Sequence, residues 1–363
     1  MYRTYRLIII LFAILLWGCG NNNTPIANRT VLVYMAADNN LYRNAIKDIK
    51  EMLQATVPAN NNLLVYVDAP AASSDSIPKL FEIKNNKIKE ICRYNKHNSA
   101  SGEVLSMVLS DAMRLYPAID FGLVLWSHGT GWLPQGRYDE IKANSPQYSF
   151  GLDNKQEMEI IELEKALPTK LKFIIFDACL MSNIETIYQL RHKADYIIAS
   201  PTEILIAGFP YDKIVGLLFA HNIDYQAIAE NYMKYYKQQT GVLQSATIAV
   251  VATKHLSELA HNIRSGINKD SILYLHQDAQ KYEIGDNAVF YDLFDYLQQA
   301  ETQNWGQYLK NIVKYNDFTP FFLSKLKIAK SYGISIFVHH GDTLSTEYKK
   351  LDWYTDTGLM LRK

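Results

Sequence analysis

The sequence predicts an α/β fold in which a largely parallel sheet carries helices on both faces. Between residues 30 and 200, short apolar runs alternate with segments of helical periodicity, the pattern of parallel strands joined by crossover helices. The runs are nearly continuous, as expected for strands buried on both faces. With 363 residues, 48% of them hydrophobic and 20% charged, the chain is long enough to bury a sizeable core.

The charge balance excludes one class of partner. Lys and Arg together number 37, as do Asp and Glu, so the formal net charge is zero. The chain as a whole therefore has no excess of positive charge that would indicate binding to nucleic acid.

The N-terminus has the features of an exported lipoprotein. Two arginines precede an apolar run over residues 7–17, which is shorter than the roughly 20 residues needed to span a bilayer. The run leads into Leu-Trp-Gly-Cys, which resembles the bacterial lipobox and ends at Cys19. We expect a signal peptide over residues 1–19, a lipid on Cys19 that holds the protein to a membrane of the bacterial cell envelope, and a flexible tether over residues 20–28. An uncleaved anchor with an incidental cysteine is the alternative.

The remaining elements follow in order from residue 30. Strands are assigned to apolar runs, rich in branched and aromatic residues, that stop at turn clusters. Helices are assigned where apolar residues recur at helical spacing between capping and breaking residues. We expect strands at residues 30–37, 63–68, 79–83, 88–94, 121–126, 171–176 and 196–200, the third and fourth as a hairpin. We expect helices at residues 41–56, 101–116, 158–167 and 184–192.

After about residue 215 the pattern is less regular. Helices are expected at residues 224–239, 289–299 and 305–313, and strands at residues 246–253 and 333–338. We assign residues 29–215 to a catalytic core. Residues 216–363 are assigned to a C-terminal extension that packs on this core and is able to add strands to its sheet.

His128 and Cys179 each directly follow a predicted buried strand. Functional groups gather beyond the carboxyl ends of the strands in parallel sheets. A thiol attacks a carbonyl as the thiolate, so it needs a nearby base, and the resulting oxyanion needs fixed N–H donors. We therefore predict Cys179 as nucleophile, His128 as base, and Gly129 and Cys179 as backbone oxyanion donors. A buried core thiol and a turn histidine are the simpler interpretations of each residue alone.

Four segments resemble, in order, those of the clostripain family of cysteine peptidases (family C11). They are VYMAADNNL at residues 33–41, WSHGTGW at 126–132, FDACLM at 176–181, and the stretch from ADYIIAS to GFPY at 194–211. The histidine also precedes the cysteine by about 50 residues, as in caspases. The resemblance implies a caspase-like α/β/α sandwich, a dyad of Cys179 and His128, and cleavage of peptides or proteins after Arg or Lys.

A pocket for a basic side chain needs a carboxylate, because burying an unpaired cation is costly. Asp177 and Glu203 are the candidates for this P1 pocket. The alternatives are a structural hydrogen bond for Asp177 and a solvated loop position for Glu203. Asp177 shares a strand face with Cys179, so its charge would oppose thiolate formation unless a positive group offsets it.

Members of the clostripain family often mature by self-cleavage between the histidine and the cysteine. Residues 129–157 are predicted as one long polar loop, rich in Gly and Pro, and loops of this length are usually functional or mobile. Lys142, which has small and polar neighbours, is the first expected cleavage site and Arg137 the second. A loop that shields the cleft and is never cut is the alternative.

No cofactor and no metal-ligating set are expected to be required. Calcium assists some members of the family, and the oxygens of Asp38, Asn39 and Asn40 are candidate ligands for it. Turn formation explains these three residues equally well.

Two other functions stay open. One is a catalytically silent relative that binds peptides or a partner at the cell surface. The other is an unrelated α/β hydrolase that uses Ser127 or Ser182, although the G-x-S-x-G elbow is absent. The sequence also leaves open a disulfide between Cys92 and Cys179.

Overall fold

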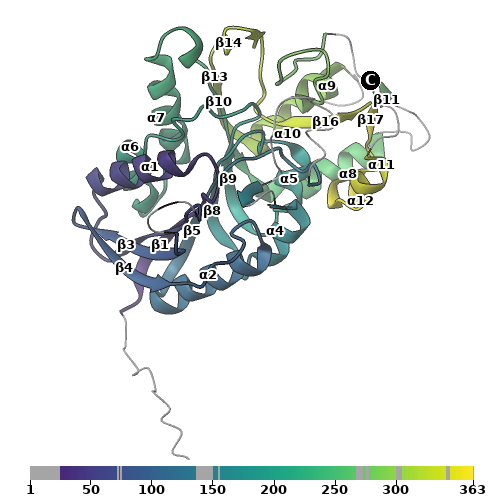
Figure 1. The fold of residues 1–363 in the computed structure, drawn as a ribbon. Coiled ribbons are helices and arrows are strands. Elements are labelled where there is room, and N and C mark those ends of the chain that lie inside the picture. Colours follow the sequence, from purple (N-terminus) through teal and green to yellow (C-terminus); the bar gives the residue numbers. More distant parts are fainter. Residues whose placement is uncertain are drawn as a thin grey trace, which may run out of the picture.

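The computed structural model describes residues 25–71, 73, 76–135, 150–153, 156–266, 273–274, 278–299, 305–340 and 344–362. A nine-stranded sheet organises the molecule (Figure 1). In spatial order its strands are β13 (Val313–Phe318), β10 (Thr247–Ala252), β9 (Ala194–Ala199), β8 (Leu171–Asp177), β5 (Ala118–Trp126), β1 (Ala27–Ala36), β2 (Asn61–Asp68), β3 (Lys79–Lys84) and β4 (Lys87–Arg93). The strands from β9 to β2 run parallel to one another, and two antiparallel strands complete each edge.

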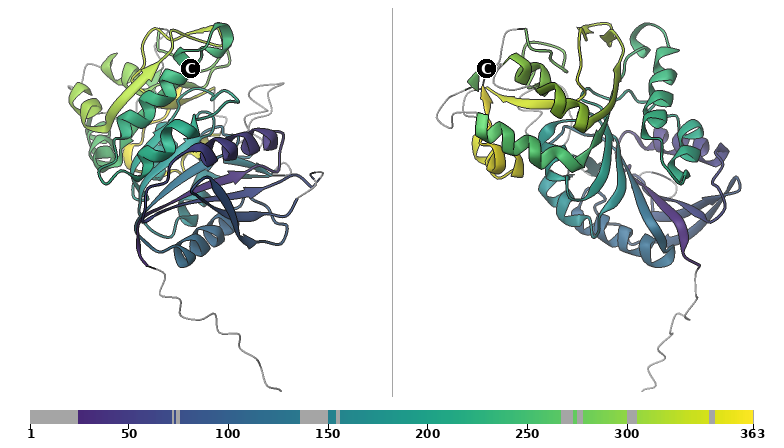
Figure 2. Two further views of the ribbon diagram at one scale, coloured as in Figure 1. Left: turned by 90° about the vertical axis from the view of Figure 1, so that its left-hand side faces the viewer. Right: turned by 180° about the vertical axis from the view of Figure 1, so that it is seen from behind.

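Helices cover both faces of this sheet, and Figure 2 shows the sheet lying between the two layers. Alternate residues of β1 explain why: Val31 and Val33 belong to one buried cluster, whereas Leu32 and Tyr34 belong to the other. The first cluster includes residues of α1 (Tyr42–Gln54), α6 (Tyr211–Ile214) and α7 (Tyr225–Lys237). The second includes residues of α2 (Gly102–Leu115), α4 (Ile160–Ala166), α5 (Ile184–Gln189) and α8 (Leu256–Gly266). The predicted α/β/α sandwich with a mostly parallel sheet is confirmed.

The C-terminal part of the chain contributes to two sheets. Its strands β10 and β13 form one edge of the central sheet. A second sheet contains β11 (Leu273–Tyr274), β17 (Leu361–Arg362), β16 (Ser335–His339) and β12 (Phe290–Asp292). The helices of this part are α9 (Leu293–Gln299), α10 (Trp305–Ile312), α11 (Ser345–Tyr348) and α12 (Asp352–Thr357). The shorter elements are β14 (Phe321–Phe322), β15 (Leu326–Lys327), and the 3-10 turns Val215–Phe219, Gly241–Leu243 and Thr253–His255.

Two predicted elements are wrong in part, and strand β13 was not among the predictions. The expected loop at residues 129–157 contains a hairpin of β6 (Phe150–Asp153) and β7 (Gln156–Met158). The expected helix at residues 289–299 begins with β12, which pairs with β16. The expected helix at residues 305–313 is followed by β13, a strand that the sequence pattern did not indicate. In the last two cases a distant strand supplies the pairing partner, so local periodicity could not reveal it.

The parallel register places the two predicted catalytic residues side by side. Trp126 at the end of β5 pairs with Asp177 at the end of β8. His128 and Cys179 each come two residues later, so they occupy equivalent positions at the carboxyl edge of the sheet. Cys92 and Cys179 are both free thiols, which excludes the disulfide. Among the described residues, no helix is long and apolar enough to cross a membrane.

Candidate active site

A cleft of about 230 Å³ opens at the carboxyl edge of the sheet. Three segments line it: Trp126 to His128 after β5, Asp177 to Cys179 after β8, and Glu203 to Ile206 after β9. The ends of three neighbouring parallel strands thus bring together the two predicted catalytic side chains and both predicted P1 carboxylates. Leu41 and Gly208 complete the lining.

The imidazole of His128 is oriented by an asparagine. His128 Nε2 lies 2.7 Å from Asn40 Oδ1, an acceptor, so the proton of the neutral ring sits on Nε2 and Nδ1 is the basic nitrogen. Burial lowers the pKa of His128 to about 4, which keeps the ring neutral at pH 7. Asn40 follows β1, the strand next to β5, so the same strand-end rule that indicated His128 could have indicated it.

The thiol of Cys179 contacts the backbone of Ile204. The Ile204 N–H donates to Sγ at 3.3 Å, and Sγ lies 3.7 Å from the Ile204 carbonyl oxygen. Leu180 adopts a left-handed conformation with φ of 61°, which is rare for a residue with a Cβ. Its N–H donates to Thr202 O at 2.9 Å, and its carbonyl accepts from Asn183 Nδ2 at 2.8 Å. These bonds hold the sharp turn that presents Cys179 at the cleft.

The thiol is protonated in the substrate-free protein. Burial, together with the charges of Glu203 and Asp177, raises the pKa of Cys179 to about 12, although the Ile204 N–H acts in the opposite direction. A neutral thiol therefore faces a neutral imidazole rather than forming an ion pair with it. A nucleophilic role for this thiol would require its proton to be transferred during the attack.

Gly129 is required by a close approach within the protein. A Cβ at this position would lie 2.6 Å from the carbonyl oxygen of Cys179 and 3.0 Å from Met181 Sδ. The histidine and cysteine loops therefore pack backbone to backbone. The Gly151 N–H donates a hydrogen bond to the His128 carbonyl at 3.0 Å, and this bond attaches β6 to the histidine loop.

Asp177 is a buried carboxylate at the base of the cleft. It is 5% exposed and accepts hydrogen bonds from the Phe209 N–H at 3.2 Å and the Tyr211 hydroxyl at 2.9 Å. Gly208 permits this arrangement, because a Cβ there would lie 2.8 Å from Asp177 Oδ2. Burial raises the pKa of Asp177 to about 6, against the effect of the two hydrogen bonds. Both roles considered for Asp177 are therefore compatible with the structure: its carboxylate makes structural hydrogen bonds, and it also lines the cleft.

The two candidate serine nucleophiles are structural. Ser127 Oγ donates to the Ala36 carbonyl at 2.7 Å, and Ser182 Oγ donates to the Gly333 carbonyl at 2.6 Å. Both residues are buried. The hypothesis of an unrelated serine hydrolase is therefore wrong.

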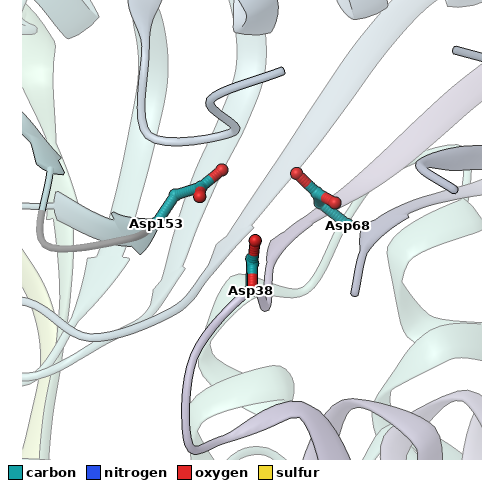
Figure 3. Close-up of side chains that lie close together, drawn as sticks. All are labelled: Asp38, Asp68 and Asp153. Carbon is teal, nitrogen blue, oxygen red and sulfur yellow. The ribbon is translucent and has the colours of Figure 1, made fainter. Parts of the chain in front are cut away.

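Three carboxylates gather near the cleft, at Asp38, Asp68 and Asp153 (Figure 3). Each has an oxygen within 4.8 Å of the others. Calcium prefers six to eight oxygen ligands, but the Lys96 ammonium already binds Asp38 and Asp68, and Asp153 accepts two hydrogen bonds from Ser99. With Lys96 in place, the residues present do not fit a calcium ion.

The asparagines of the predicted calcium turn have other partners. Asn39 Nδ2 donates to the carbonyls of Ala36 and Leu152, and Asn40 contacts His128. The sequence did not single out Asp68 or Asp153. Cys19, Arg137 and Lys142, the predicted lipidation and self-cleavage sites, lie outside the described residues.

A thiol and an imidazole that closely follow adjacent parallel strands and line one cleft are the arrangement expected of a cysteine peptidase with a caspase-like fold. The comparisons with known proteins agree. The model of the clostripain family matches residues 33–349, and the chain belongs to that family.

Clostripain from Hathewaya histolytica is 31% identical over 216 residues, which are 51% of this chain and 41% of clostripain. The chain thus matches less than half the length of this curated relative. Two solved structures are similar over nearly their whole length. An inactive zymogen C11 protease from Parabacteroides distasonis has 34% identity and a TM-score of 0.78, covering 92% of this chain and 98% of its own. A secreted C11 cysteine protease from Bacteroides thetaiotaomicron, in complex with an irreversible peptide inhibitor, has 31% identity and a TM-score of 0.77. The match covers 91% of this chain and 99% of that protease.

Proposed function

We propose that this chain is an endopeptidase that cleaves after Arg or Lys, with Cys179 as nucleophile and His128 as general base. The observation that carries the proposal is the register of β5 and β8, which sets both residues over one cleft with the Asp177 carboxylate at its base. The relative whose structure holds a peptide inhibitor supports the peptide as substrate.

In the proposed mechanism, Cys179 Sγ bonds to the scissile carbonyl carbon while its proton passes to His128 Nδ1. The carbonyl electrons move to the oxygen, which the backbone N–H groups of Gly129 and Cys179 would stabilise. His128 then returns the proton to the leaving amine as the C–N bond breaks. Water, deprotonated by His128, hydrolyses the thioester and regenerates the thiol.

A basic P1 side chain would also activate the thiol. The charge of Asp177 is one of the causes that raise the pKa of Cys179. A bound Lys or Arg that pairs with Asp177 neutralises this charge and so favours the thiolate. Glu203, at the rim of the cleft, is the second carboxylate available to the P1 residue.

A panel of fluorogenic peptides that differ only at P1 tests the proposal. Peptides with Arg or Lys are expected to be cleaved at least about 100-fold faster than those with Leu, Gln or Asp, because the last three leave Asp177 unpaired. Preferred cleavage after an apolar or acidic residue would disprove the specificity. Absence of turnover for every peptide would favour the catalytically silent alternative.

Self-processing is proposed within residues 129–157, at Lys142 first and Arg137 second. Its supports are the position of this segment between the two dyad residues and the description of one relative as an inactive zymogen. Intact mass measurement is expected to find two fragments in the wild type and one uncut chain in Cys179→Ala. An uncut wild type, or equal cleavage of both proteins, would contradict self-processing.

Export with a lipid anchor on Cys19 is proposed from the lipobox-like sequence and from a relative described as secreted. The mass measurement above, made on protein extracted from a bacterial envelope, also tests it. A diacylglyceryl addition that disappears in Cys19→Ala is the expected finding. An N-terminal fragment that retains Met1 would support the uncleaved anchor instead.

A further inference from the structure

Lys96 is the positive centre of the acidic cluster formed by Asp38, Asp68 and Asp153. Its Nζ lies 2.6 Å from Asp68 Oδ1, 2.8 Å from Asp38 Oδ2 and 2.9 Å from the Ala69 carbonyl oxygen, which satisfies all three N–H donors of the ammonium. Burial acts to lower the pKa of Lys96, but its hydrogen bonds to Asp38 and Asp68 outweigh this and raise it. The side chain is therefore charged at neutral pH.

This charge stabilises the ionised form of the cluster. Asp68 is fully buried, and its Oδ2 has no hydrogen-bond partner among the residues that the structure describes. The three carboxylates point toward a common centre (Figure 3), and their oxygens lie within 4.8 Å of one another. Burial, and to a smaller extent the charges of Asp153 and Asp38, raise the pKa of Asp68 to about 7, whereas Lys96 acts in the opposite direction and favours the charged carboxylate.

The cluster is connected to the active site through the turn of residues 38–40. Asp38 begins this turn and binds Lys96. Asn39 ties it to β6 by donating to the Leu152 carbonyl at 2.8 Å. Asn40 ends it and orients the His128 ring through Nε2 at 2.7 Å. A shift of Asp38 away from Asp68 would therefore move the group that fixes the proton position of His128.

We propose that Lys96 is a positioning residue for His128, and that its ammonium occupies the place of a divalent cation and makes the peptidase independent of calcium. The inference rests on the proposed function for its catalytic consequence, but the replacement of a cation by Lys96 stands on the geometry of the cluster. Without the ammonium, three converging carboxylates and the Ala69 carbonyl would form an all-oxygen set, which suits Ca²⁺.

The test compares wild type with Lys96→Met, which keeps the length of the side chain and removes its charge. Wild type is expected to show the same kcat and the same Tm in EDTA and in millimolar CaCl₂. In EDTA, Lys96→Met is expected to lose about 10- to 100-fold in kcat with little change in KM, because substrate contacts remain while the histidine is misplaced. Added CaCl₂ should raise the Tm of Lys96→Met and restore kcat to within about threefold of wild type.

Lys237→Met is the matched control, since Lys237 also pairs with an aspartate, Asp317, at 2.6 Å and is exposed to a similar degree. This variant should keep wild-type activity and should not respond to calcium. Asp38→Ala keeps the Lys96–Asp68 pair but removes the acceptor that ties the turn to Lys96, so it should lose kcat without rescue by CaCl₂, and it serves as the test if Lys96→Met does not fold.

Each contrary result overturns the proposal in a recognisable way. Wild-type kcat in Lys96→Met or in Asp38→Ala would show that the cluster does not position His128. Loss of Tm or activity of the wild type in EDTA would show that Lys96 does not replace a metal. Failure of CaCl₂ to bind Lys96→Met by calorimetry would show a merely structural lysine. If the wild type cleaves no peptide, the proposed function fails, while calorimetry and Tm still decide the cation replacement.

Discussion

Replacing Cys179 with alanine is expected to lower kcat by at least about 10⁴-fold for every substrate, because no other thiol of the described residues lines the cleft. His128→Ala is expected to cost about 10²–10⁴-fold, the usual contribution of a general base. The loss is expected to be large because burial raises the pKa of the thiol to about 12, so the base must remove its proton during attack. The measurement is single-turnover and steady-state cleavage of a Lys-P1 peptide.

Cys92→Ala provides the control, since Cys92 is the other free thiol among the described residues and lies on β4, away from the cleft. It should retain wild-type kcat. Circular dichroism and thermal unfolding of all three variants separate loss of chemistry from loss of fold. Full activity in Cys179→Ala, or equal losses in Cys92→Ala, would remove Cys179 as the nucleophile.

Asp177→Asn is expected to lower kcat/KM for Lys and Arg peptides by about 10²–10³-fold, the effect of removing one partner of a buried ion pair. The amide oxygen of asparagine can still accept from the Phe209 N–H and the Tyr211 hydroxyl, so the loops should keep their positions. Cleavage after neutral residues should be unchanged or faster, because the thiol then has one fewer negative neighbour. A uniform loss for all P1 residues would show that Asp177 acts only on the fold.

The same variant is expected to change the pH profile. Asp177 has its pKa raised to about 6, so it is ionised above that pH and protonated below it. The kcat/KM of wild type for a Lys peptide should therefore fall as the pH drops through about 6. Asp177→Asn should lack this step and fall only near pH 4, where His128 becomes protonated. A wild-type profile that is flat between pH 7 and 5 would contradict the assignment.

The sequence predicted that His128 and Cys179 would lie side by side, because both closely follow strands whose apolar runs are continuous and local. The same reasoning failed at β12, where Phe290 to Asp292 form a strand only by pairing with β16, far along the chain. It also missed Lys96 as the partner of Asp38 and Asp68, since these residues come from three separate segments without a characteristic spacing. Asn40 was visible as a turn residue, but its contact with His128 depends on the order of β1 and β5 in the sheet.

The direction of β1 determines which side of the molecule would carry an N-terminal anchor. β1 runs parallel to β5 and β8, so its first residue, Ala27, lies at the edge of the sheet opposite the cleft. A ten-residue strand separates the two edges by about 30 Å. An anchor at the N-terminus would therefore be attached to the side of the molecule opposite the cleft. With the anchor on this side, a freely diffusing polypeptide could enter the cleft without passing between the protein and the membrane.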